Sequence, residues 1–370
     1  METAQIYEIV NSVTSQALGR TDLTAIDTAS FIAMGDAVLN SGTNVEPWIN
    51  TLVQRIGRTI ISYRAYSSQF EELAFTDMEW GAIMQKIKVQ MPSAIEDVSV
   101  ELEDGESIDH YIIAKPKATQ KLFVIRSPYT FMVTIQREWL REAFLSESAM
   151  ESFIGAIFGE LTNAMAVGQE ELGRACMSNF IVNTDESQRI PLLTNYIANV
   201  PSADPTLTSD TAIYDGGFLR YAIAQMKYYS MRMTEMSALY NKEGETRHTP
   251  ISMQRFCIRS DYLVNMETQV EYAAFHDEYL DVGAEVKVNY WQSALTPGSI
   301  LIDGGEGDDI QIDNILGFIH DRAALGTYRK ETEVLTTPVN ARGKYYNTFF
   351  HVNDNRFNDM SENGLVFLIA

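Results

Sequence analysis

The sequence predicts an α+β fold, with helices and strands grouped in separate stretches of the chain. Apolar residues recur at helical spacing in residues 1–57 and 148–182, strand-like runs lie between residues 58 and 135, and apolar and aromatic runs close the chain. The 370 residues suffice for two or three domains with buried cores. The order of helical arm, hairpin, long helix, mixed lobe and strands is an α+β pattern.

Residues 1–57 are expected to form an N-terminal arm of short helices. Gly42 and Pro47 interrupt the arm, and Gly57 is expected to end its last helix. Two apolar sets at helical spacing predict these helices: Ile6, Ile9, Val10 and Val13, then Ile49, Leu52, Val53 and Ile56.

Residues 58–126 are expected to form a long hairpin whose charges are separated along the chain. Strand-like runs lie at 60–61, 83–89 and 122–125. Two interpretations of the charges stay open, because charge runs are usually solvated faces but can also form packing surfaces. The acidic residues are Glu96, Asp97, Glu101, Glu103, Asp104, Glu106 and Asp109, and the basic residues that follow are Lys115, Lys117, Lys121 and Arg126.

Residues 148–182 predict a helix roughly 50 Å long, at about 1.5 Å per residue. Ser148 and Glu151 have the spacing of a capping box at its start. Glycines lower helix propensity, so their presence here indicates a helix that lies close against a sheet. They are Gly155, Gly159, Gly168 and Gly173.

Residues 184–318 predict a separate lobe of helices and strands. A helix is expected over 218–240, a strand over 256–259, and a further helix from Asp261 that Ser260 caps. The last strands are expected over 299–302, 310–315, 344–352 and 365–369, with a turn at 341–343.

The net charge of −22 comes from 50 acidic and 28 basic residues, and such a chain repels phosphate. Sequence-specific duplex binding is therefore not expected, although solubility alone would also account for the charge. Cys176 and Cys257 lack metal-type spacing, so we expect no disulfide framework and a reducing compartment. Neither a signal peptide nor a membrane-spanning apolar run is expected.

Motifs of catalysis are missing from the sequence, which has no Walker A, zinc-protease, nucleophile-elbow or Rossmann pattern. Residues 276–278 (HDE) could be a metal or base cluster, but a surface helix end is the favoured interpretation. Residues 304–309 (GGEGDD) match one calcium β-roll repeat, yet a single copy favours a turn. Four methionines are expected to fill the core rather than to form an adaptable interface: Met226, Met231, Met233 and Met236. We predict no catalytic, cofactor-binding or metal-binding residue and no cofactor.

Five segments resemble the major capsid proteins of tailed double-stranded DNA bacteriophages, in particular those of small short-tailed Bacillus phages. They are residues 48–57 (WINTLVQRIG), 150–154 (MESFI), 259–263 (RSDYL), 318–322 (FIHDR) and 340–352 (NARGKYYNTFFHV). Each segment is short, and the resemblance rests on their order and spacing.

The resemblance implies the Hong Kong-97-like phage capsid fold. Its parts would be an N-terminal arm (1–57), an extended loop or E-loop (58–126), a peripheral domain with the long spine helix (127–183), an axial domain (184–318), and peripheral-domain strands with a C-terminal strand (319–370). An encapsulin-like compartment shell has the same fold and is the alternative. An unrecognised α+β enzyme is a third hypothesis, which the missing motifs disfavour.

The same resemblance implies a structural, non-enzymatic subunit that assembles into the icosahedral head shell around the phage DNA. Pentamers and hexamers of the chain, a scaffolding protein and a portal are the expected partners. The packaged DNA would be contacted non-specifically at most, and no membrane is involved. The expected location is the virion, with the bacterial host cytoplasm as the place of assembly.

The E-loop charges are also expected to contact a neighbouring subunit, because so many acids cannot be neutralised within one hairpin. Lys86 and Lys88 would be available for covalent crosslinking between subunits, but crosslinking is not predicted. The residues proposed for the inter-subunit contact are Glu101, Glu103, Asp104, Lys115, Lys117 and Lys121.

Overall fold

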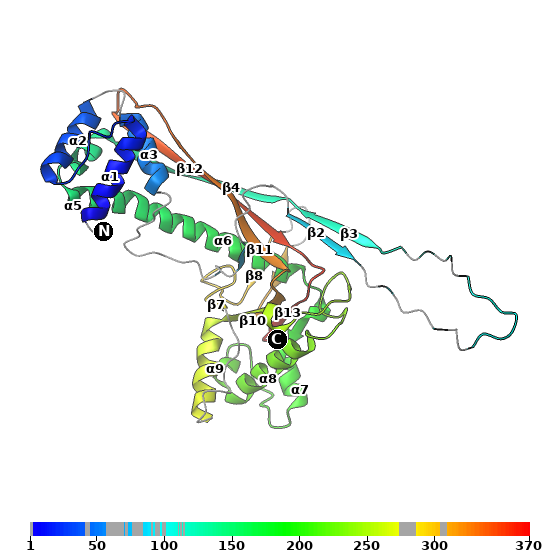
Figure 1. Ribbon diagram of the computed structural model, residues 1–370. Coiled ribbons are helices and arrows are strands. Elements are labelled where there is room, and N and C mark those ends of the chain that lie inside the picture. Colours follow the sequence, from blue (N-terminus) through cyan, green and yellow to red (C-terminus); the bar gives the residue numbers. More distant parts are fainter. Residues whose placement is uncertain are drawn as a thin grey trace.

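The computed structural model shows an elongated molecule with a helical bundle at one end, a long twisted sheet in the middle, a compact lobe beside it and a projecting hairpin (Figure 1). The N-terminus lies in the bundle and the C-terminus in the lobe. The structure describes residues 3–40, 45–56, 70, 73–75, 84–89, 92, 97, 101–109, 111, 113, 115–273, 286–303 and 309–370.

Helices α1 (Thr3–Leu18), α2 (Thr28–Asn40) and α3 (Val45–Ile56) form the bundle together with α4 (Arg137–Ala143) and α5 (Glu147–Ile154). The predicted arm helices are confirmed, but the predicted break at Pro47 is wrong, because Pro47 lies in the first turn of α3, where a proline is tolerated. Gly42 and Gly57 lie outside the described residues. The ring of Phe144 packs against Trp48 and Phe31, at centroid distances of 5.0 and 5.6 Å. The buried Trp48 indole donates to Thr14 Oγ1 at 2.9 Å, which satisfies its only polar group.

The predicted long helix is present as α5, a π-helical turn (Gly155–Gly159) and α6 (Glu160–Asn183). The predicted capping box is wrong, because Ser146 is the N-cap and its hydroxyl accepts from the Ala149 amide at 3.2 Å. The glycines are only partly explained by close packing. A Cβ on Gly173 would meet Phe70 at 3.0 Å, whereas one on Gly155 would have no neighbour within 4 Å.

A four-stranded sheet lies alongside α6, with the order β1 (Ala74–Phe75), β11 (Leu325–Thr336), β12 (Tyr345–Asn358), β4 (Ile125–Gln136). Alternate residues of β12 are buried, as expected for a sheet with one covered face. The predicted turn before β12 is confirmed. The Asn340 side-chain oxygen accepts from the Arg342 and Gly343 amides there, and Lys344 has a φ of 53°.

The lobe is built on a five-stranded sheet with the order β5 (Arg189–Pro191), β13 (Gly364–Leu368), β10 (Ile315–Asp321), β6 (Gln254–Arg259), β7 (Val286–Val288). The C-terminal strand β13 is inserted between β5 and β10, so the predicted closing strand is confirmed as part of the core. A smaller hairpin pairs β8 (Ile300–Ile302) with β9 (Ile310–Ile312). The predicted strand over 310–315 is broken at Asn314, whose φ is 59°.

Helices α7 (Leu192–Asn199), α8 (Gly216–Arg232) and α9 (Ser260–Ala273) cover this sheet. The predicted helix over 218–240 ends early, at Arg232, because the Met233 carbonyl accepts from the Thr249 amide at 2.7 Å and the chain turns. The predicted Ser260 cap is wrong, since its hydroxyl donates to Asn289 instead. Short 3-10 turns lie at Glu186–Gln188, Ala212–Tyr214 and Ile251–Met253.

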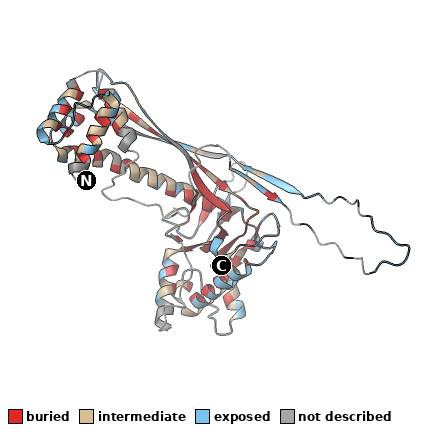
Figure 2. Ribbon diagram, in the orientation of Figure 1, coloured by how far each residue is buried: buried red, intermediate tan, exposed pale blue. Residues whose placement is uncertain are grey.

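Strands β2 (Met84–Val89) and β3 (Ala118–Phe123) form an antiparallel ribbon, called the hairpin below, which leaves the body next to β4. Buried residues concentrate in the two sheets and the bundle, and much of the hairpin is exposed (Figure 2). No helix in the described part of the chain has the length and apolar character needed to cross a membrane.

Candidate functional site

The described residues contain no group of three or more His, Cys, Asp or Glu side chains that could hold a metal ion. The candidate clusters at 276–278 and 304–308 lie outside these residues. Both cysteines are buried, and burial raises the pKa of Cys176 to about 12. Its thiol therefore stays protonated at neutral pH, which makes it a poor nucleophile.

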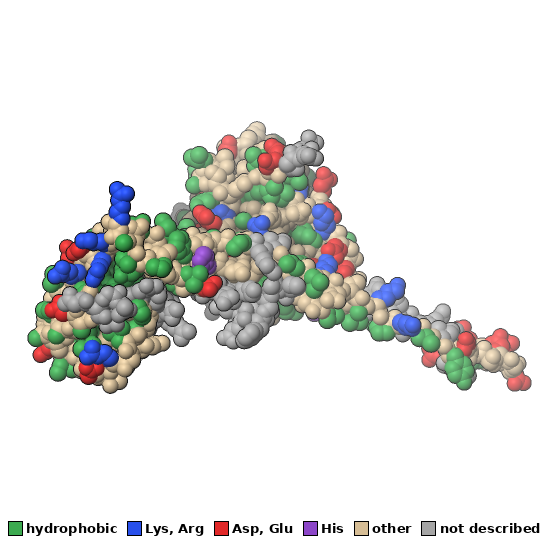
Figure 3. All heavy atoms as spheres, turned by 90° about the horizontal axis from the view of Figure 1, so that it is seen from above, with side chains coloured by type: hydrophobic (Ala, Val, Ile, Leu, Met, Phe, Trp, Pro, Cys, Tyr) green, Lys and Arg blue, Asp and Glu red, His purple; other side chains and the backbone are tan. Residues whose placement is uncertain are grey.

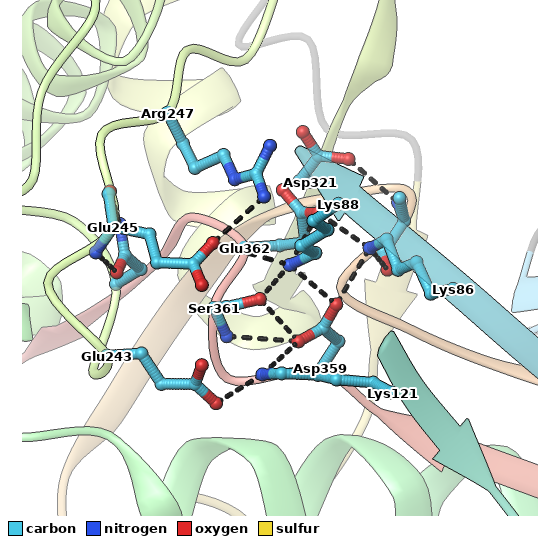
Figure 4. A network of polar contacts seen from close by, with 12 residues as sticks. Lys86, Lys88, Lys121, Glu243, Glu245, Arg247, Asp321, Asp359, Ser361 and Glu362 are labelled. Atoms are coloured by element: carbon cyan, nitrogen blue, oxygen red, sulfur yellow. Dashed lines mark hydrogen bonds and ion pairs between the residues drawn. The ribbon is translucent and has the colours of Figure 1, made fainter. Parts of the chain in front are cut away.

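The most concentrated charge cluster joins the base of the hairpin to the body (Figure 4). Along β2 the side chains alternate, with Ile87 exposed and Lys86 and Lys88 turned toward the body. Lys121 of β3 pairs directly with Lys86 across the ribbon. Like charges opposite each other destabilise a strand pair unless nearby acids neutralise them.

Asp359, in the connection between β12 and β13, contacts all three lysines. Its Oδ2 lies 2.8 Å from Lys86 Nζ and 3.0 Å from Lys88 Nζ, and its Oδ1 lies 3.1 Å from Lys121 Nζ. Oδ1 also accepts from the Ser361 hydroxyl at 2.6 Å. The Asp359 side chain is fully buried, so these bonds form away from bulk water.

Further acids surround the same lysines. Glu362 Oε1 lies 2.6 Å from Lys86 Nζ and 3.2 Å from Lys88 Nζ. Glu243 pairs with Lys121, and Glu245 pairs with Arg247 at 2.9 Å. Four basic and four acidic side chains thus balance, and with Ser361 they make up what we name the anchor cluster: Lys86, Lys88, Lys121, Arg247, Glu243, Glu245, Asp359, Glu362 and Ser361.

The electrostatics keep the central carboxylate ionised. Burial alone would raise the pKa of Asp359, but hydrogen bonds from Lys86, Ser361 and Lys88 and the charge of Lys86 outweigh it and hold the pKa far below its usual range. The anchor cluster is therefore suited to hold the hairpin by ion pairs.

Backbone hydrogen bonds tie the turn that carries Asp359 to both sheets. The Asp359 amide donates to the carbonyl of Ala324, the residue before β11, at 2.6 Å. The Asp321 amide at the end of β10 donates to the Asn363 carbonyl at 2.9 Å. The Lys242 amide donates to the Met360 carbonyl at 3.1 Å. The hairpin is thus attached where the two sheets meet.

Acidic side chains gather toward the free end of the hairpin (Figure 3). Of the six residues predicted to contact a neighbouring subunit, Lys121 lies in the anchor cluster of its own chain. The other five are exposed, and none of them forms an ion pair within the part of the chain that the structure describes: Glu101, Glu103, Asp104, Lys115 and Lys117. Their contact with a second subunit stays a prediction.

The sequence patterns did not indicate Asp359, Ser361 or Glu362. In β2 the alternation alone would place Ile87 inside and the flanking lysines outside, and the structure has the opposite arrangement. A signal was present in residues 359–363 (DMSEN), a mostly polar run between two apolar strands. Such a run predicts a surface loop, but this one is buried by the hairpin.

Comparison with known proteins identifies a family and a fold. The model of the Phi29-like phage major capsid protein family matches residues 9–368. The major capsid proteins of Bacillus phages PZA and B103 are 26% and 24% identical over 179 and 229 residues, or 47% and 58% of this chain. The matched segments span only 38% and 49% of those relatives.

A solved structure has a similar fold. A chain in the capsid structure of Staphylococcus phage Andhra aligns with a TM-score of 0.56 at 13% identity. The alignment covers 83% of this chain and 85% of that one. At this identity the likeness concerns the fold alone.

Proposed function

Because the chain belongs to the family of Phi29-like phage major capsid proteins, we propose that it builds the shell of a phage head. The match over residues 9–368, nearly the whole chain, is the observation that carries the proposal. The comparisons give the encapsulin-like alternative no support, since the relatives and the solved structure are phage capsid proteins.

The exposed face of the hairpin supports an assembling subunit. Ile87 and Val89 on β2 and Leu122 on β3 are 65%, 61% and 56% exposed. A two-stranded ribbon is marginally stable alone, and its anchor cluster covers only the opposite face. Exposed apolar side chains gathered on one face are typical of protein–protein contact surfaces. A second copy of the chain supplies this partner in the proposed shell.

The elongated shape supports contacts that close into rings. The helical bundle and the free end of the hairpin lie at opposite ends of the molecule (Figure 1). A contact between two different surfaces of identical copies is heterologous, and it generates a ring when the rotation closes. Rings of five and six copies are the capsomers that the proposal requires.

The proposal includes partners and a location beyond the shell itself. Scaffolding protein and portal would guide assembly in the host cytoplasm, and the virion would be the final location. The net charge of −22 supports an inner wall that holds DNA without binding it tightly.

The test is the association state of the purified chain, alone and with the scaffolding protein of the same phage. Sedimentation velocity and negative-stain micrographs should show rings or closed particles. A chain that remains monomeric under both conditions, over the full range of protein and salt concentrations, would contradict the proposal.

A further inference from the structure

One carboxylate of the anchor cluster, that of Asp359, pairs with cations from both strands of the hairpin. Lys86 and Lys88 of β2 and Lys121 of β3 all lie within 3.1 Å of Asp359. Lys86 and Lys121 face each other across the ribbon, so removing the carboxylate would leave the four cations of the anchor cluster with only three acids to offset this repulsion. Asp359 thus neutralises a repulsion that would otherwise push the hairpin away from the body.

The position of Asp359 connects the hairpin to two sheets at once. The residue follows β12 of the four-stranded sheet and precedes β13 of the five-stranded sheet by five residues. Its side chain binds the hairpin. In its turn the Asp359 amide donates to Ala324 just before β11, and the Met360 and Asn363 carbonyls accept from Lys242 and from Asp321 of β10. A shift at this turn would therefore move the hairpin relative to both sheets.

We infer that Asp359 is the positioning residue of the hairpin, and that it sets the direction in which the hairpin leaves the body. Glu362 supports the same lysines from the other side, at 2.6 and 3.2 Å. The direction matters for assembly because the hairpin can meet a second copy only where it points. This last consequence rests on the proposed shell function, whereas the positioning itself does not.

The anchor is strong because of its burial. The Lys88 side chain is 5% exposed and that of Asp359 is fully buried, so salt screens this pair far less than a surface pair. Removing one partner of a buried ion pair leaves an uncompensated charge, which is strongly unfavourable in place. The hairpin can relieve that cost by leaving the body and hydrating its lysines. Asp359→Asn should therefore release the hairpin.

The test is a distance between two spin labels in the unassembled full chain, measured by pulsed electron resonance. One label is placed at Gln120→Cys on the exposed face of the hairpin and the other at Ala224→Cys on α8. Both native cysteines are buried, so labelling is directed to the new sites. The parent should give a narrow distance distribution, and Asp359→Asn a shifted one, about twofold wider, as expected for a released hinge.

Asp354→Asn is the matched control. Asp354 is also a buried carboxylate of β12, but it lies within the four-stranded sheet, where it accepts a hydrogen bond from the Tyr129 hydroxyl at 2.5 Å. A general loss of stability would affect both variants, whereas a change of hairpin direction should appear only in Asp359→Asn. The double variant Lys86→Gln/Lys121→Gln removes two of the three ion pairs to Asp359 and should also widen the distance distribution, so it carries the test if Asp359→Asn does not fold.

An unchanged distribution in both Asp359→Asn and the double variant would overturn the inference. The same variants, examined for assembly, separate it from the proposed function. If the parent forms closed particles, Asp359→Asn should form open or irregular ones while Asp354→Asn does not. If the parent itself never assembles, the shell function fails, and the distance measurement still decides the role of Asp359.

Discussion

At the scale of single residues, His320 carries an imidazole that is fully buried in the five-stranded sheet. Its ring stacks on Phe318 at a centroid distance of 4.9 Å, and Nε2 has no hydrogen-bond partner in the described part of the chain. Burial and, to a smaller extent, the charge of Arg255 on β6 lower the pKa of His320 to about 4, although a hydrogen bond with the Asp321 carbonyl opposes them. The folded chain therefore holds His320 neutral across mildly acidic pH.

This ionisation predicts a pH-dependent stability. The unfolded chain protonates His320 below about pH 6.5, whereas the folded chain does so only near pH 4. The unfolded state binds more protons in this interval. The free energy of unfolding should therefore decrease as the pH is lowered from about 6.5 to about 4, by up to about 3 kcal/mol. His320→Phe should remove this component, measured by urea unfolding of the unassembled chain between pH 4 and 7.

The pH dependence of the parent alone does not isolate His320, because the neighbouring Asp321 also has a shifted pKa, which is raised mainly by burial. A raised carboxyl pKa favours the folded state as pH falls, so it opposes the effect of His320. The difference between parent and His320→Phe isolates the histidine. Parallel pH profiles for the two proteins would contradict the assignment.

At the scale of elements, the long helix carries glycines for different reasons. Gly155 has helical dihedrals, φ −61° and ψ −43°, and open space around its missing Cβ. Gly155→Ala should therefore stabilise the chain by about 0.5–1 kcal/mol, the usual gain for this change in a helix. Gly173→Ala is the contrast, because its Cβ would meet Phe70 at 3.0 Å and should cancel that gain. Thermal unfolding of both variants measures the difference, and equal stabilisation would show that Phe70 yields freely.

The acidic end of the hairpin leads to a prediction about assembly. Its residues 101–109 are exposed and carry no basic side chain. Replacing Glu101, Glu103 and Asp104 with Ser should leave the folded subunit unchanged but weaken its assembly, most clearly at low salt, where charge pairs are least screened. Each exposed pair contributes only about 0.2–1 kcal/mol, but many copies act together in a shell.

The control changes the same number of charges elsewhere, at three exposed acids of the lobe. The assembly yields of the two triple variants are measured by light scattering at a series of salt concentrations and compared. The same yield and salt dependence in both would mean that the acidic run is a solvated face. The control substitutions are Glu186→Ser, Asp210→Ser and Glu235→Ser.

The sequence predicted the elements better than the contacts between them. The helices of the arm, the long helix and the closing strand follow from apolar periodicity, which is a local property. The N-cap is Ser146 and not the predicted Ser148, because the helix begins at Glu147 and the cap binds the free backbone amides of its first turn. The anchor cluster could not be predicted, because Lys86 and Asp359 are 273 residues apart and meet only in the folded chain.

At the scale of the whole molecule, the predicted function rested on the resemblance to a protein family, whereas the anchor cluster was found only in the structure. Composition and charge argued against sequence-specific duplex binding, and the sequence contains no enzyme motif of the classes considered, but these properties do not specify a shell. The order of short segments predicted the capsid family, which the family match over residues 9–368 confirmed. How the two sheets and the hairpin meet depends on buried ion pairs that no periodicity reveals.

The most direct test of the shell function is electron cryomicroscopy of particles assembled from this chain. We predict closed particles with rings of five and six copies, in which the hairpin of each copy leaves the body at the anchor cluster and lies against a neighbouring copy. Particles without such rings, or a hairpin that contacts no second copy, would contradict the account.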